Sequence, residues 1–219
     1  SIFSFLGIML GVAILIIVMS VMNGFKTELT NKILGLNPHI VIQSNGFNID
    51  DRYISKIENN FKDISISKTF SGEGIIINNN QAKGIIFKGV NNEEKKIKEF
   101  LENNIVSGDV KNFKNNNVFI GSELAFNLNL NEGDRINLMS SSFVATPLGS
   151  LPKQENFNVA GIFNTGFIEF DQNIIFLTTK DALSIFDKDT KDQDLEIYLR
   201  DPLDANLYKK KIEKFNQNY

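Results

Sequence analysis

The feature that constrains this chain most is an uncharged, strongly apolar run at its N-terminus. No Asp, Glu, Lys or Arg occurs from Ser1 to Phe25, and Ile2 to Met22 is almost unbroken Ile, Leu, Val, Met and Phe. At roughly 1.5 Å per helical residue the run spans about 30 Å, the thickness of the hydrocarbon core of a bilayer. The run therefore predicts a transmembrane helix over residues 1–24.

A cleaved signal peptide is the alternative interpretation of this run. No basic residue precedes it, and Val21-Met22-Asn23-Gly24 is a poor cleavage site, because such sites carry small residues in an A-x-A-like pattern. The chain also begins with Ser rather than Met. We therefore expect an N-terminally truncated fragment of a longer membrane protein.

The apolar pattern continues beyond the membrane as an amphipathic helix. Phe25, Leu29, Ile33 and Leu36 recur at helical spacing. The Asn37-Pro38 pair ends the helix, because proline disfavours helical geometry in the residue before it. Residues 25–38 are thus predicted to form a stalk.

Two glycines in the membrane helix form a Gly-x-x-x-Gly pair, Gly7 and Gly11. This spacing lets the backbone of a second helix approach closely, although glycine is also common in membrane helices without such a role. Helix packing and chance are equally good interpretations of the pair.

From His39 onward the pattern changes to short apolar runs separated by Asn, Gly and Asp clusters, with a few amphipathic helices. Strands and helices intermix without strict alternation, which favours an α+β domain over a doubly wound parallel sheet. The predicted strands are 40–43, 64–70, 74–77, 82–90, 118–120, 135–139, 157–163, 174–177 and 195–199, and the predicted helices are 51–61, 93–102, 123–128, 179–186 and 202–215. Residues 39–219 are therefore expected to form one water-exposed α+β domain.

One stretch of this domain, residues 140–156, holds two of the four prolines between two predicted strands, which is long for a hairpin loop. Pro147 and Pro152 restrict their own backbone angles and those of the residues before them, so the segment loses less entropy on docking than a Gly/Ser loop would. We expect it to project from the domain and to present Leu148 and Leu151, and an ordinary surface loop is the alternative.

The sequence contains no recognisable catalytic constellation. Gly84 to Gly89 has the glycine spacing of a phosphate loop, but Val90-Asn91 follows where Lys and Ser or Thr are required. The chain has no cysteine and a single histidine, and its net charge of −3 gives no field to attract nucleic acid. The acidic run from Asp187 to Asp194 lacks the turn glycine of a calcium loop. We therefore expect no enzyme activity, no cofactor and no metal site.

Several motifs resemble the lipoprotein-releasing ABC transporter permeases of the LolC/LolE family. The resemblance covers nearly the whole chain, with gaps mainly from Asn91 to Asn117. The motifs are Gly7-Ile8-x-Leu10-Gly11-Val12, Ser20-Val21-Met22-Asn23-Gly24-Phe25, Glu28-Leu29, Ile33-Leu34-Gly35-x-x-Pro38-His39, Gly121-Ser122-Glu123-Leu124-Ala125, Leu130-x-x-Gly133-Asp134-x-Ile136, Thr146-Pro147-Leu148-Gly149-x-x-Pro152, Val159-Ala160-Gly161-Ile162-Phe163, Phe170-Asp171 and Asp201-Pro202.

The resemblance implies an α+β periplasmic domain of the MacB-like periplasmic core type, with mixed sheets and flanking helices, on a permease subunit of the bacterial inner membrane. It implies that the subunit pairs with a second LolC/LolE-like permease subunit and with a separate LolD-like ATPase subunit, so that ATP hydrolysis takes place outside this chain. The implied activity is extraction of triacylated lipoproteins from the membrane and their transfer to the periplasmic chaperone LolA.

In this family a protruding loop, the hook, docks the chaperone. The resemblance carries that role to residues of the 140–156 segment, namely Thr146, Pro147, Leu148, Gly149, Leu151, Pro152 and Gln154. The sequence departs from the family at Glu155, where hooks tend to carry a basic residue, and Lys153 is the cation that could replace it.

Acyl chains in such a transporter need flexible apolar walls, and Val12, Ile16, Met19 and Met22 could supply one, with simple lipid contact or helix packing as an equal alternative for each. Two other classes of protein stay open. One is a MacB/FtsX-like permease for efflux or cell-wall regulation, and the other is a membrane-anchored periplasmic binding or scaffold protein.

Overall fold

The structure, a computed structural model, describes residues 2–45, 49–78, 81–91, 93–147 and 149–217. The chain divides into two compact units, residues 1–38 and residues 39–219. The first unit is the single helix α1, Ile2–Leu36, which continues through the predicted stalk without a break. Its apolar part, Ile2–Thr27, has a mean hydropathy of 2.9, and all of its side chains are exposed. By length and composition α1 can cross a membrane. The side chains of residues 28–36, which carry most of the predicted stalk pattern, lie outside the described part of the structure.

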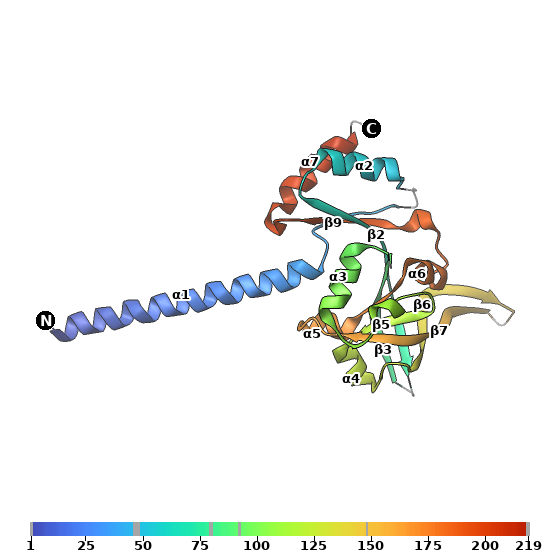
Figure 1. Ribbon diagram of the computed structural model, residues 1–219, viewed down its shortest axis with the longest axis horizontal. Coiled ribbons are helices and arrows are strands. Elements are labelled where there is room, and N and C mark those ends of the chain that lie inside the picture. The colour runs from blue at the N-terminus through green and yellow to red at the C-terminus, as the bar shows by residue number, and fades with distance from the viewer. Residues whose placement is uncertain (1, 46–48, 79–80, 92, 148, 218–219) are drawn as a thin grey trace. The chain divides into compact units, whose positions relative to one another are not determined.

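The second unit contains a small antiparallel sheet in the order β1-β9-β2, formed by β1 (Ile40–Ile42), β9 (Asp194–Leu199) and the first part of β2 (Ile64–Asn78). Helices α2 (Asp51–Asn60) and α7 (Ala205–Gln217) lie on one side of this sheet (Figure 1). Ile197 and Ile212 are buried between the sheet and α7.

The rest of β2 passes into a larger sheet whose strands form a closed ring of pairs. β2 pairs with β3 (Gln81–Val90), β3 with β8 (Ile174–Thr178), β8 with β5 (Asn117–Gly121), β5 with β7 (Gly149–Phe163), β7 with β6 (Arg135–Thr146) and β6 with β2 again. β4 (Ile105–Gly108) adds to β7. The β3–β8 and β5–β7 pairs are parallel and the others are antiparallel, so the sheet is mixed.

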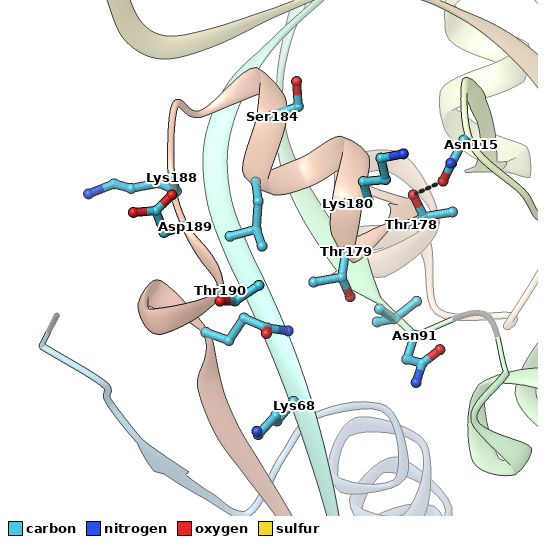
Figure 2. Close-up of a pocket in the computed structure, with 13 residues that line it drawn as sticks. Lys68, Asn91, Asn115, Thr178, Thr179, Lys180, Ser184, Lys188, Asp189 and Thr190 are labelled. Atoms are coloured by element: carbon cyan, nitrogen blue, oxygen red, sulfur yellow. Dashed lines mark hydrogen bonds between the residues drawn. The ribbon is translucent and has the colours of Figure 1, made fainter. Parts of the chain in front are cut away.

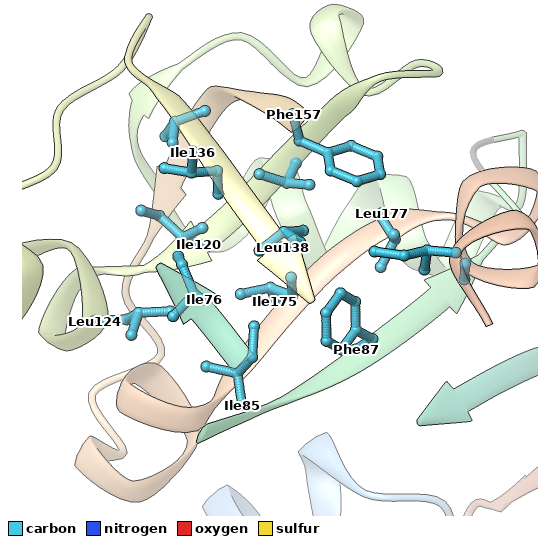
Figure 3. Close-up of a cluster of buried hydrophobic side chains, with 14 of the residues drawn as sticks. Ile76, Ile85, Phe87, Ile120, Leu124, Ile136, Leu138, Phe157, Ile175 and Leu177 are labelled. Carbon is cyan, nitrogen blue, oxygen red and sulfur yellow. The ribbon is translucent and has the colours of Figure 1, made fainter. Parts of the chain in front are cut away.

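Strand alternation fills the ring with apolar side chains (Figure 3). Ile76, Phe87, Ile120, Leu138 and Phe157 point inward and are almost completely buried. Successive strand residues point to opposite faces, so alternate residues of each strand reach this core.

Four helices flank the ring: α3 (Lys95–Asn104), α4 (Ser122–Leu128), α5 (Ile168–Asn173) and α6 (Thr179–Ile185). The expected α+β architecture, with mixed sheets and flanking helices, is confirmed. β4 and α5 were not predicted, because each is too short for its periodicity to stand out. The predicted strands 64–70 and 74–77 are one continuous strand, since the intervening residues 71–73 continue the pairing with β3.

Candidate functional site

The candidate site is the outer part of the β6–β7 hairpin, residues 140–156, which is called the hook below. Beyond Ser140, the described residues of β6 pair with β7 alone, and the pairing continues outward to Thr146 opposite Gly149. The hook is therefore a two-stranded ribbon that extends away from the ring of strands (Figure 1).

The sequence predicted a projecting loop over residues 140–156. The predicted loop conformation was wrong. The structure has two paired strands, with Phe143 opposite Pro152 and Val144 opposite Leu151. The β-branched and aromatic residues Phe143, Val144 and Thr146 favour a strand, and Pro152 can join a ribbon because an edge strand tolerates a missing N–H donor. Gly149, with φ +119°, supplies the turn conformation that other residues rarely adopt.

Of the residues proposed to dock the chaperone, Thr146, Gly149, Leu151 and Pro152 lie in the outer part of this ribbon, whereas Gln154 lies at its base, opposite Met139. Pro147, Gly149, Leu151 and Gln154 are exposed, and Pro152 is half-buried. Thr146 is the last residue of β6, and Leu148 lies outside the described residues.

Sequence reasoning missed two apolar residues of the hook. Phe143 is 64% exposed and Val144 is 45% exposed, which is unusual for large apolar side chains on a strand, and Leu151, across from Val144, is 55% exposed. The signal was present as the run Phe-Val-Ala-Thr directly before Pro147. Together these side chains make the hook a mainly apolar projection, as expected of a surface that contacts a protein or a lipid.

A separate cavity of about 650 Å³ opens beside α6 (Figure 2). Lys68, Lys180 and Lys188 line it, together with Asp189 and several hydroxyl and amide side chains. Thr178 Oγ1 donates to Asn115 Oδ1 at 3.0 Å. Among the described residues, the lining holds one carboxylate, that of Asp189, and no histidine.

Metal binding finds no support in the described ranges. Within them, no group of three or more His, Asp or Glu side chains is close enough together to hold an ion. The acidic run after α6 instead forms a local turn, in which the backbone N–H of Asp189 donates to Asp192.

A buried charged network lies where β2 leaves the small sheet. The Lys88 ammonium is 3.1 Å from Glu196 Oε2, and their side chains are only 10% and 6% exposed. The Tyr198 hydroxyl donates to the same carboxylate oxygen at 2.7 Å. These contacts join β3 to β9, one strand from each sheet.

The start of α3 adds a second acid and a second cation to this network. The Ser67 hydroxyl donates to Glu94 Oε2 at 2.7 Å, and the Lys96 ammonium lies 2.9 Å from the centre of the Tyr198 ring. Burial lowers the pKa of Lys96 to about 8 and raises the pKa of Glu94. Burial also raises the pKa of Tyr198, with the nearby Glu196 charge acting in the same direction.

On α1, the residues proposed to line a lipoprotein cavity, Val12, Ile16, Met19 and Met22, recur at spacings of four, three and three and so lie along one side of the helix. Met22 also lines a shallow apolar groove of about 270 Å³ with residues of the adjoining face. All four side chains are exposed, at 51–61% of their surface. Within the described residues, and apart from the local helix backbone, no atom lies within 4 Å of the position where a Cβ of Gly7 or Gly11 would lie.

A family model, the MacB-like periplasmic core domain, matches residues 1–215. The chain therefore belongs to the family of proteins that carry this domain. This class agrees with the apolar helix and the α+β unit that follows it.

Comparison with individual proteins identifies a more specific group of relatives. The chain is 31% identical over 232 residues to the lipoprotein-releasing system transmembrane protein LolC of Buchnera aphidicola subsp. Schizaphis graminum, which covers 100% of this chain and 54% of that protein. It is 27% identical over 212 residues to LolC of Neisseria meningitidis serogroup B, covering 92% and 50%, and 27% identical over 212 residues to LolE of Haemophilus influenzae, covering 93% and 50%. The resemblance to the LolC/LolE permeases is confirmed, and the chain spans about half the length of these relatives.

Proposed function

We propose that this chain is part of a permease subunit that releases lipoproteins from the inner membrane and passes them to the chaperone LolA in the periplasm. In this proposal α1 crosses the membrane, residues 39–219 lie in the periplasm, and a second permease subunit and a separate ATPase subunit complete the transporter. The names of the relatives and the family of the domain support it.

The observation that carries the proposal is the hook. A two-stranded ribbon exposes Phe143, Val144 and Leu151, and the sequence Thr146-Pro147-Leu148-Gly149, which resembles the family's hook, joins its two strands. A projecting apolar ribbon can enter a concave apolar site on a partner, and its paired strands reduce the entropy lost on docking. The hook thus favours chaperone docking, and with it a LolC-type subunit, over a MacB/FtsX-like role.

The hook residues divide the docking task. The turn at Pro147, Leu148 and Gly149 would enter the chaperone first, while Leu151 and Gln154 would contact its rim. Glu155 Oε1 accepts a hydrogen bond from Ser184 and lies 3.9 Å from Lys153 Nζ, so its charge is partly compensated within the domain. We infer that docking depends on apolar contact more than on charge.

Binding of the domain 39–219 to LolA of the same organism tests this proposal. All the described strands and the buried core clusters belong to these residues, so the domain has the contacts to fold without α1. We expect binding by the unmodified domain, and a loss of at least about a hundredfold in affinity for Pro147→Arg or Leu148→Asp, because each buries a charge in an apolar contact.

The matched control is Asn127→Arg, which adds the same side chain at an exposed position of α4. This variant should bind LolA normally. Normal LolA binding by both hook variants would contradict the proposed docking residues. Absence of binding by the folded, unmodified domain would contradict the LolC-type assignment and favour a LolE-type subunit or an efflux relative.

A further inference from the structure

The hook is joined to the domain by side chains at its base. Residues Ser140 to Ser142 form an irregularity in the β6–β7 ladder, because the register shifts between Met139 and Phe143. Such bulges bend a strand and change the direction of the residues beyond the bulge. The direction of the hook is therefore decided at these residues.

Three side chains at this base donate to three consecutive backbone carbonyls at the C-terminal end of α6. The Ser140 hydroxyl donates to the Ile185 carbonyl at 2.6 Å, and the Ser142 hydroxyl donates to the Phe186 carbonyl. From β7, the Lys153 ammonium donates to the Ser184 carbonyl at 2.6 Å. The last carbonyls of a helix have no partner within the helix, and a cation near them interacts favourably with the helix dipole.

Further contacts tighten the same joint. The Ser140 hydroxyl also accepts from the Ser142 N–H at 3.2 Å, which fixes the bulge itself. Lys153 Nζ lies 3.9 Å from Asp187 Oδ1, and Ser184 Oγ lies 3.3 Å from Glu155 Oε1. Both strands of the hook are thus held by one helix end.

The helix end that receives these bonds is rigidly packed. Ile185 and Phe186 are buried, and the Phe186 ring lies 5.2 Å from the rings of Phe70 and Phe87. A Cβ at Gly72 would come within 2.5 Å of the Phe186 ring, so the ring fills the space that this glycine leaves. The base of the hook is therefore tied to the core and not to a mobile loop.

We propose that Ser140, Ser142 and Lys153 form a clamp on the C-terminal end of α6 that holds the hook at one angle to the domain. An isolated two-stranded ribbon is marginally stable in water and has no fixed direction of its own. The clamp supplies that direction, so these three are positioning residues that prepare the hook for its partner. This inference rests on the proposed docking function only for the identity of that partner.

The angle can be measured without any partner. The chain contains no cysteine, so spin labels on Ser150→Cys in the hook and Asn127→Cys on α4 would be unique. In the domain 39–219 we expect a narrow distribution of distances between the two labels, measured by pulsed electron paramagnetic resonance. Lys153→Met, or Ser140→Ala combined with Ser142→Ala, should at least double its width, and hydrogen exchange of the hook amides should rise about tenfold.

Controls separate positioning from general stability. Lys188→Met removes a neighbouring lysine whose ammonium pairs with Asp192, outside the hook, so it should leave the distribution narrow. Lys153→Arg should also keep the distance distribution narrow, because a guanidinium can donate to the Ser184 carbonyl as the ammonium does. Amide exchange in β5 should stay unchanged in Lys153→Met, since its core neighbours are untouched.

The outcomes distinguish this clamp from the proposed function. A narrow distribution and unchanged hook exchange in both clamp variants would overturn the clamp, whatever the domain binds. Broadening in those variants would support it, even if the unmodified domain failed to bind LolA. Where LolA does bind, we expect the clamp variants to lose about tenfold in affinity, because the hook must then be ordered on binding.

Discussion

At the residue scale, two motifs that resemble the LolC/LolE family have packing roles in this domain. Gly121 and Asp171 come from two separate motifs, and the structure brings them into direct backbone contact. Asp171 is 1% exposed, and its carboxylate accepts from the backbone N–H and the hydroxyl of Thr165. His39 is also structural, because its Nδ1 accepts from the Leu199 N–H at 2.8 Å.

Gly121→Ala tests the first of these contacts. A Cβ at this position would lie 2.0 Å from the Asp171 carbonyl oxygen, which is backbone and cannot rotate away. We expect a loss of about 2–3 kcal/mol in the free energy of unfolding, measured by denaturant titration of the domain 39–219.

Gly84→Ala is the matched control, because nothing lies within 4 Å of the corresponding Cβ position. It should change the free energy of unfolding by less than about 0.5 kcal/mol. Equal effects of the two substitutions would show that the close approach of Gly121 to Asp171 is not what requires glycine there.

At the element scale, α1 presents two different faces along its apolar length. Gly7, Gly11, Val18 and Phe25 follow one another at spacings of four and seven, and this stripe includes residues that line the shallow groove. Small residues at such spacing allow close contact between membrane helices. We therefore expect this stripe to face a neighbouring helix of the assembled transporter.

Gly11→Leu should impair that assembly. Within the described part of the chain, no atom outside the local helix backbone is within 4 Å of the Cβ position, so the larger side chain should act on a partner. Co-purification with the second permease subunit should fall about tenfold in Gly11→Leu.

Ala13→Leu enlarges an exposed residue on the opposite side of the same helix and should leave assembly unchanged. Normal co-purification of Gly11→Leu with the second permease subunit would contradict a packing role for the glycine pair.

At the scale of the whole domain, the charged network between β3 and β9 joins the two sheets. Lys88 and Glu196 form a buried pair, and removing one member of such a pair leaves an uncompensated charge. The network is therefore a sensitive point for the stability of residues 39–219.

Lys88→Met should lower the free energy of unfolding by about 3–5 kcal/mol in denaturant titration, because Glu196 would stay buried without its cation. Adding Glu196→Leu should recover most of this loss, since two apolar side chains of similar volume need no charge compensation. If Lys88→Met alone were as stable as the unmodified domain, the ion pair would not be what holds the two sheets together.

Much of the fold could be predicted from the sequence because its signals are local. The uncharged run predicted α1, and the short apolar runs predicted the positions of most strands of the ring. The positions of Pro147 and Pro152 marked the segment that projects. These features depend on residues close together in the chain, where periodicity and backbone restriction act directly.

Only the tertiary structure decided what depends on residues far apart in the chain. Ser140 meets the end of α6 at a separation of 45 residues, and Lys88 meets Glu196 across two sheets. The hook is a ribbon and not a loop because β6 and β7 pair along its length. Pairing partners are selected by the closure of the ring, and the buried charges by the contact of the ring with the small sheet, and no local pattern in the sequence specifies which strand will lie beside which.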